Sequence, residues 1–156
     1  MYTELSIGFY FKEDTPKKVI DIIEYMVSPE KRDEIEETEE LGLPEHPLFH
    51  TERWQWMLNS AGSYYFRRKP SLVWLFDDIK KQWNLSFTTN IKNYDSEWQK
   101  FCHWIAPYVE EDEAPIGTYR YEEDELPTLV IADKGIIRFG NIVDLSSYPV
   151  NTAEIT

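Results

Sequence analysis

The chain has 156 residues, which fits a single domain, and its 42% hydrophobic and 15% aromatic content excludes a disordered acidic chain. No apolar run approaches the roughly 18 residues that span a membrane, the N-terminus lacks the features of a signal peptide, and the single cysteine, Cys102, excludes an internal disulfide. These features predict a soluble cytoplasmic protein without a membrane partner.

The net charge of −13 is unevenly distributed along the chain. Residues 30–45 and residues 110–125 each hold eight acidic residues, which together exceed half of the 29 acids. Residues 53–100, between these two segments, carry eight basic and four acidic residues. Such a charge distribution repels nucleic acid and attracts basic partners. A purely solubilising role is the alternative, and the sequence leaves it open.

The N-terminal part predicts a strand followed by a helix. Residues 4–11 are rich in aromatic and apolar side chains, which is typical of a strand. Thr15 and Pro16 predict the start of a helix, with the hydroxyl as N-cap and the proline at the first helical position. An apolar stripe at helical spacing follows, made of Val19, Ile20, Ile23, Met26 and Val27. Ser28-Pro29 ends this helix.

The middle of the chain predicts an acidic segment, a short helix and several strands. Residues 30–45 have almost no apolar period and fit a solvated helix or a loop equally well. A short helix is expected over 51–58, and strands over 63–66, 71–76 and 83–91. The strand at 83–91 is the clearest, because apolar and polar residues alternate along it. It is expected to form a hairpin with 71–76.

The C-terminal half predicts a second helix and three further strands. Asp95 or Ser96 is expected to cap the helix, with Gln99 completing a capping box from Ser96. Pro107 weakens the end of the helix. The apolar face of this helix is expected to comprise Trp98, Phe101, Cys102, Ile105 and Val109. Strands are expected over 117–122, 128–132 and 136–142.

This order of elements predicts an α+β fold, an antiparallel β-sheet with two main helices packed on one face. Residues 133–135, Asp-Lys-Gly, predict a hairpin turn, because the glycine is free to take positive φ. Residues 122–127 predict the turn before it, closed by a proline. A single α+β domain is expected over residues 1–143, followed by a loose polar C-terminal tail over 144–156.

Two stretches, IKNYDSEWQKFCHWIAPYV at 91–109 and YRYEEDELPTLV at 119–130, carry a resemblance. They are similar to a loose group of small, uncharacterised acidic bacterial proteins of the mobile-element or immunity-like kind, over about residues 70–131. The resemblance implies a protective or inhibitory binding role. It implies no catalytic residues, and the acidic segment in the N-terminal third lies outside it.

Motifs for nucleophilic or metal chemistry are weak in this sequence. Cys102 lies next to His103, but neighbouring helical positions point about 100° apart, so a Cys–His contact is not expected. His46 and His50 have the spacing of helical metal ligands, yet Pro47 interrupts the segment. We therefore expect no catalytic residue, no metal site and no cofactor.

Two other chemistries remain as alternatives. Asp77 and Asp78 follow an apolar strand, so they are the best candidates for a carboxylate-using hydrolase, which needs a carboxyl whose pKa is raised in an apolar pocket. A hairpin turn explains the same two residues. Residues 64–69 combine aromatic and basic side chains, as nucleic-acid surfaces do. The net charge of −13 opposes direct nucleic-acid binding, which is not expected.

The leading hypothesis is a non-enzymatic acidic binding protein, of the immunity or inhibitor type, that docks a basic protein such as a toxin, nuclease or effector. Clustered carboxylates steer such partners, and aromatic rings supply contact area. A nucleic-acid-mimicking inhibitor from a phage or mobile element is the second hypothesis, and a homodimer is left open. The expected partner-binding residues are Glu110, Glu111, Asp112, Glu113, Tyr119, Arg120, Tyr121, Glu122, Glu123, Asp124 and Glu125.

Overall fold

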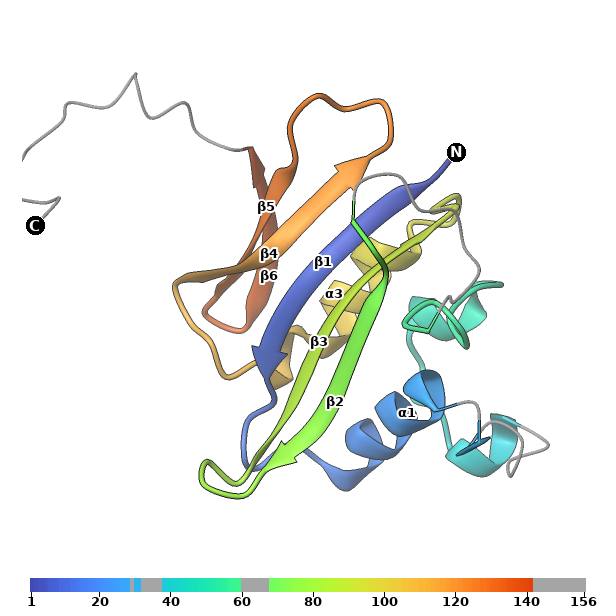
Figure 1. Ribbon diagram of the computed structural model, residues 1–156. Coiled ribbons are helices and arrows are strands. Elements are labelled where there is room, and N and C mark those ends of the chain that lie inside the picture. Colours follow the sequence, from blue (N-terminus) through green and yellow to red (C-terminus); the bar gives the residue numbers. More distant parts are fainter. Residues whose placement is uncertain (29, 32–37, 60–67, 142–156) are drawn as a thin grey trace, which may run out of the picture.

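The computed structural model describes residues 1–28, 30–31, 38–59 and 68–141. Its centre is one antiparallel sheet in the order β2-β3-β1-β4-β5-β6 (Figure 1). The strands are β1 (Thr3–Tyr10), β2 (Ser71–Asp77), β3 (Gln82–Ile91), β4 (Ala114–Tyr121), β5 (Thr128–Asp133) and β6 (Ile136–Asn141). The helices are α1 (Lys17–Val27) and α3 (Glu97–Ile105), with short 3-10 helices at Thr38–Leu41, Pro47–His50 and Ala106–Tyr108.

Both α-helices lie on the same face of the sheet in Figure 1, so the predicted α+β fold is confirmed. The expected strand at 63–66 and the expected tail at 144–156 lie outside the described residues, as does much of the first acidic segment. Among the described residues, no helix has the length and apolar character needed to cross a membrane.

The core lies between the sheet and the helices. β1 is central, and its alternate residues Leu5, Ile7 and Phe9 are buried on the face that carries the helices. β3 follows the predicted alternation, with Leu85 and Phe87 buried on the same face. The Phe87 ring contacts Trp98 and Phe101 of α3, with centroids 5.8 and 6.0 Å apart. The apolar face predicted for the second helix, from Trp98 to Val109, is wholly buried.

The expected start of the first helix is wrong in one respect. The N-cap of α1 is Pro16 rather than Thr15, and no side chain caps the helix. The Thr15 hydroxyl instead donates to the carbonyl of Lys12, 2.7 Å away, within the turn that precedes the helix. Because the Thr15 hydroxyl is bonded to a backbone carbonyl of this turn, it does not cap the amides at the start of the helix.

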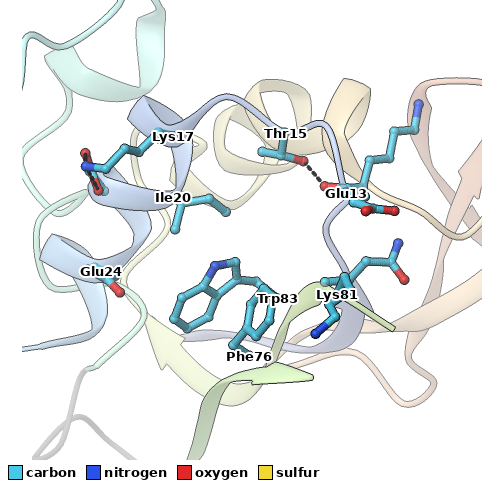
Figure 2. A pocket seen from close by; sticks show the side chains of 11 residues that line it. Glu13, Thr15, Lys17, Ile20, Glu24, Phe76, Lys81 and Trp83 are labelled. Atoms are coloured by element: carbon cyan, nitrogen blue, oxygen red, sulfur yellow. Dashed lines mark hydrogen bonds and ion pairs between the residues drawn. The ribbon is translucent and has the colours of Figure 1, made fainter. Parts of the chain in front are cut away.

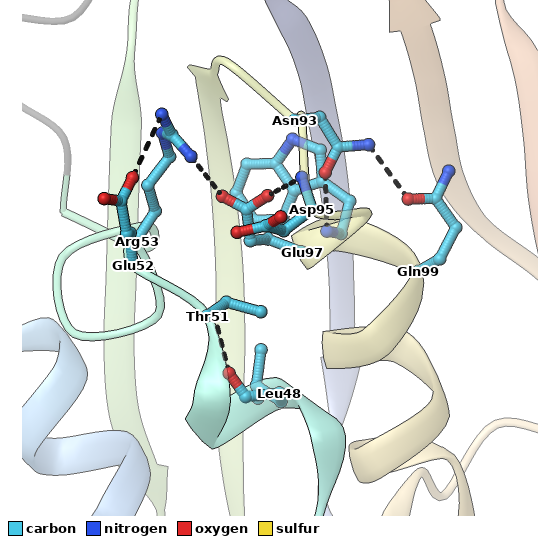
Figure 3. Close-up of polar contacts among 9 residues, drawn as sticks. Leu48, Thr51, Glu52, Arg53, Asn93, Asp95, Glu97 and Gln99 are labelled. Carbon is cyan, nitrogen blue, oxygen red and sulfur yellow. Dashed lines mark hydrogen bonds and ion pairs between the residues drawn. The ribbon is translucent and has the colours of Figure 1, made fainter.

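The expected capping box of the second helix is also wrong. Ser96 takes a left-handed backbone conformation, with φ 54°, and its side chain makes no capping bond. Figure 3 shows the arrangement that replaces it: Asn93 Oδ1 accepts from the amide of Trp98 at 2.9 Å, and Asn93 Nδ2 donates to Gln99 Oε1. The cap is thus supplied from outside the helix, by a residue three positions earlier than expected.

A buried ion pair ties the segment after the second 3-10 helix to α3. Arg53 Nη1 lies 3.2 Å from Glu97 Oε2, and the Glu97 side chain is fully buried while that of Arg53 is 16% exposed (Figure 3). Glu97 Oε1 accepts from the amide of Asp95 at 2.7 Å. The helix expected over 51–58 is wrong, because this segment consists of turns and bends. It nevertheless buries its apolar side chains in the core.

The hairpins predicted from the turn residues are confirmed. β2 pairs with β3 from Asp77↔Gln82 onward, and β5 pairs with β6 from Asp133↔Ile136. Lys134 and Gly135 both have positive φ, 52° and 80°, as a tight two-residue hairpin turn requires. β4 starts three residues earlier than expected, at Ala114.

Candidate partner-binding site

The two acidic runs of the predicted site lie at opposite ends of β4. Residues 110–113 precede the strand and residues 122–125 follow it. An eight-residue strand spans about 26 Å at about 3.3 Å per residue. The two runs therefore form two separate surfaces.

The first run is engaged in local bonds that hold the sheet together. The Glu111 carboxylate accepts from the amide of Tyr10 at 2.9 and 3.1 Å, and burial raises the pKa of Glu111. Asp112 Oδ1 accepts from the amide of Lys134 at 2.7 Å, and Glu113 lies 3.9 Å from Lys134 Nζ. This run connects the start of β4 to the end of β1 and to the β5–β6 turn.

The second run is more open to solvent. Glu122 Oε1 accepts from the amide of Tyr2 at 3.0 Å, which ties the turn to the N-terminal residues. The side chains of residues 123–125 are exposed. Within the described part of the chain, residues 122–125 form no ion pair with a lysine, arginine or histidine. Among the described residues, these four successive carboxylates thus have no lysine, arginine or histidine nitrogen within 4 Å.

The three residues before this run point in different directions. Tyr119 is on the helix face, where its hydroxyl accepts from Gln99 Nε2 at 3.0 Å and its ring packs on Phe139. Arg120 is on the other face, 8% exposed, opposite Glu4 in the register and bonded to the carbonyl of Asp124. Tyr119 and Arg120 therefore make structural contacts within the sheet, and their part in partner binding stays a prediction.

Tyr121 belongs to the acidic turn itself. Partial burial and the carboxylates of Glu123 and Glu122 raise the pKa of Tyr121, and Tyr94 and Asp124 add to this effect. These groups are consequently close in space.

Two residues that sequence reasoning missed extend the surface. Tyr94 is 66% exposed, and its hydroxyl accepts from the N-terminal amine of Met1 at 2.8 Å. Leu126 is 67% exposed at the end of the acidic turn. Proximity of Tyr94 to the turn depends on the alignment of β3 with β1 and β4, which no local pattern encodes. We call the combined surface the acidic–aromatic end, made of Tyr94, Tyr121, Glu122, Glu123, Asp124, Glu125 and Leu126.

The environment of Asp77, one of the two carboxyls suggested for a hydrolase, favours the ionised form, whereas a general acid must hold a proton. Asp77 Oδ1 accepts from the amides of Ile79 and Lys80 at 2.9 and 3.0 Å, and Oδ2 accepts from the Tyr10 hydroxyl at 3.3 Å. The bond from the Lys80 amide is the main reason that the pKa of Asp77 is lowered. A general acid at neutral pH needs a raised pKa. Asp77 acts as the cap of the β2–β3 turn.

The cysteine and histidines also fall into structural contacts. Cys102 is buried, and burial raises the pKa of its thiol to about 12, far from a reactive thiolate. His46 Nδ1 accepts from the amide of Leu48, so His46 Nε2 carries the proton and donates to His103 Nδ1 at 2.9 Å. His50 contacts Glu45 instead. No group of three potential metal ligands assembles among the described residues.

A pocket of about 440 Å³ lies between α1 and the β2–β3 hairpin (Figure 2). Trp83, Phe76 and Ile20 provide its apolar wall. Its rim is of mixed charge, and Lys17 is already paired with Asp21 at 2.9 Å. The rim therefore offers no single charge sign to a ligand.

Comparison of the chain with protein-family models, curated proteins and solved structures finds no significant match. The resemblance to small acidic bacterial proteins stays a prediction.

Proposed function

We propose that the protein is a non-enzymatic binding protein, of the immunity or inhibitor type, whose acidic–aromatic end docks a basic protein such as a toxin, nuclease or effector. The main support for the proposal is the electrostatic environment of residues 122–125. Their four carboxylates form no ion pair within the described residues, and exposed Tyr94 and Leu126 stand beside them.

The physical basis is electrostatic steering followed by burial of a small apolar contact. Unpaired carboxylates raise the association rate of a cationic surface, and this effect weakens as salt shortens the Debye length to about 8 Å at physiological ionic strength. The tyrosine rings and Leu126 supply the area that a lasting contact needs, since aromatic side chains dominate binding hot spots. In this proposal, the carboxylates favour a basic partner, and the tyrosine rings supply much of the contact area.

The run at residues 110–113 has a smaller part in this proposal. Glu111 and Asp112 already accept backbone hydrogen bonds, so a partner gains little by competing for them. Their charges add to the long-range field. The docking contacts themselves come from the other end of β4.

The test is capture of a partner from the source organism by immobilised protein at low and at high salt. A variant with Glu123→Lys, Asp124→Lys and Glu125→Lys is expected to lose the partner. These three side chains are exposed, so the fold is expected to persist, which circular dichroism checks. Partner binding that is equally strong at high salt would contradict the proposal.

A matched control carries the same change of charge elsewhere on the surface. Glu13→Lys, Asp14→Lys and Glu30→Lys alter three exposed acids that make no hydrogen bond or ion pair within the described residues. This control is expected to retain the partner. Equal loss in both triple variants would mean that net charge alone drives the capture.

A further inference from the structure

One corner of the sheet, beside α1, keeps an aromatic surface partly open. Phe76 of β2 and Trp83 of β3 are paired in the register, and they point to the helix side of the sheet, as Leu85 does two residues further on. Phe76 is 40% exposed, and Trp83 and Ile20 of α1 are only partly buried. These three residues form the apolar wall of the pocket of about 440 Å³ (Figure 2), a volume within the usual range of ligand sites.

The aromatic wall of this pocket is already ordered by its own contacts. Trp83 stacks on Trp74, with ring centroids 4.4 Å apart and an interplanar angle of 12°. The edge of Phe76 meets Trp83 at 5.4 Å and 71°. A wall whose rings are held in place loses little side-chain freedom when a ligand binds. Such a wall accepts a further aromatic ring in a stacked or edge-to-face arrangement.

The charged residues that line the pocket divide into two sides of opposite net charge. The side formed by α1 has one base and two acids, a net charge of −1. The side formed by the turn before α1 and by the β2–β3 hairpin has two bases and one acid, a net charge of +1. The first set is Lys17, Asp21 and Glu24, and the second is Lys12, Glu13 and Lys81.

On each side, one charge is left over. Lys17 is paired with Asp21 at 2.9 Å, and Glu24 forms no ion pair within the described part of the chain. On the other side, the adjacent charges of residues 12 and 13 cancel, and Lys81 forms no ion pair with a described residue. The neighbouring Lys80 does not line the pocket, because its Nζ lies over the ring of Tyr10, 4.2 Å from the centroid.

The backbone holds Lys81 at the pocket. Its φ is 58°, a left-handed conformation in which glycine or asparagine is more usual. Its amide donates to the carbonyl of Asp77 at 2.8 Å, which closes the hairpin turn. The position of this lysine therefore follows from the turn, and its side chain can be changed without changing the hairpin.

We propose that this pocket binds a short peptide that has free termini and a central aromatic side chain. The aromatic ring packs on Trp83, the ammonium points to Glu24 and the carboxylate points to Lys81. A ligand with only one sign of charge would meet a like charge on one side of the pocket, so the two sides together select a zwitterion.

The separation of the two charges selects a peptide rather than a free amino acid. Figure 2 shows Glu24 and Lys81 on opposite sides of Trp83. A free amino acid carries both charges on the same α-carbon. An extended tripeptide separates them by about 10 Å, at about 3.3–3.6 Å per residue, and places its middle side chain between them.

The test is an NMR chemical-shift titration of the full chain with the peptide Ala-Phe-Ala in four forms: free, N-acetylated, C-amidated and capped at both ends. The free peptide is expected to bind with a dissociation constant on the order of 1 mM or lower. Each cap is expected to weaken binding by about two- to fivefold, because exposed ion pairs contribute modestly. Phe76→Ala is expected to weaken binding of all four forms, since it removes part of the wall.

Two variants connect each terminal charge to its proposed partner. Glu24→Gln is expected to bind the free and the N-acetylated peptide equally while still preferring a free carboxylate. Lys81→Asn, which tolerates the left-handed backbone, is expected to show the converse. The controls are Glu30→Gln, an exposed acid outside the pocket, and Lys134→Asn, a hairpin lysine with φ 52° that is also outside it. Both controls are expected to keep both preferences.

Several results would overturn the proposal. These are an absence of shifts at about 10 mM peptide, equal binding of the free and the doubly capped peptide, or a Glu24→Gln variant that keeps its preference for a free ammonium. Unchanged binding by Phe76→Ala would also overturn it. The variant with lysine substitutions at residues 123–125 is expected to bind the peptide normally, so these outcomes are separate from the test of the acidic–aromatic end.

Discussion

Replacing Arg53, which pairs with the buried carboxylate of Glu97, is expected to destabilise the protein strongly although Arg53 itself is partly exposed. Arg53→Met leaves the fully buried Glu97 carboxylate without its partner 3.2 Å away. Breaking a buried pair by removing one charge costs about 3–5 kcal/mol. Glu97 keeps its bond from the Asp95 amide, so we expect the lower end, about 3 kcal/mol.

A double variant separates this cost from lost packing. Arg53→Met combined with Glu97→Gln removes both charges and keeps a carbonyl acceptor for the Asp95 amide. The double variant should therefore be more stable than Arg53→Met alone, because no uncompensated charge stays buried.

The assay is urea unfolding followed by tryptophan fluorescence, which gives the free energy of unfolding for each variant. The control is Lys17→Met, which breaks the Lys17–Asp21 pair, whose side chains are 87% and 45% exposed. Exposed helical pairs of this kind contribute only about 0.3–0.5 kcal/mol. If Arg53→Met cost no more than Lys17→Met, or if the double variant were less stable than the single one, the reasoning would be refuted.

Two further predictions concern strand packing and pH. Gly117→Ala would place a β-carbon 1.9 Å from a β1 carbonyl oxygen, so we expect a loss of about 3 kcal/mol or more in urea unfolding. Gly140→Ala meets only ordinary contact at 3.5 Å and should be nearly neutral, and equal effects would contradict this account. Burial, and then His103, lower the pKa of His46, so the unfolded chain binds more protons as pH falls below about 6.5 and stability falls with it. His46→Asn keeps a capping side chain but cannot titrate, so its free energy of unfolding should change less between pH 7.5 and 5.5, and an unchanged difference would rule out this role.

The sheet and the helix faces could be predicted because their signals are periodic. The alternation along residues 83–91 and the apolar stripe from Trp98 to Val109 each reflect burial on one side of a regular element. The hairpin at Lys134-Gly135 was predictable because positive φ at two successive residues is a local backbone requirement. Such features are determined within one element.

Helix caps were not predictable in the same way. Ser96 has the right residue type and spacing for a capping box, but its left-handed backbone turns it away from the helix amides, and Asn93 replaces it. Similarly, Thr15 bonds within its own turn. Several polar side chains compete for the same amides at a helix start, and tertiary geometry decides among them.

The site depends on contacts between distant segments. Strand pairing places Tyr94 near the acidic turn, and packing of the second 3-10 helix on α3 brings His46 to His103 rather than to His50. The acids at residues 110–113 and 122–125 are close in sequence, yet the strand between them keeps them apart. Partner binding by these residues stays a prediction, now concentrated on the second run.

The central place of β1 has a consequence for synthesis on the ribosome. The register joins Tyr10 to Asn84 and Thr3 to Tyr121, so both neighbours of β1 are made much later than β1 itself. At about 5–20 residues per second, the wait from Tyr10 to Asn84 and from Thr3 to Tyr121 lasts between about 4 and 24 seconds. During the first of these waits, the apolar, aromatic strand has no partner strand on either side, and its exposed side chains can bind chaperones that hold nascent chains. Completion of the sheet is therefore a late event, which waits for β3 and β4 to leave the exit tunnel.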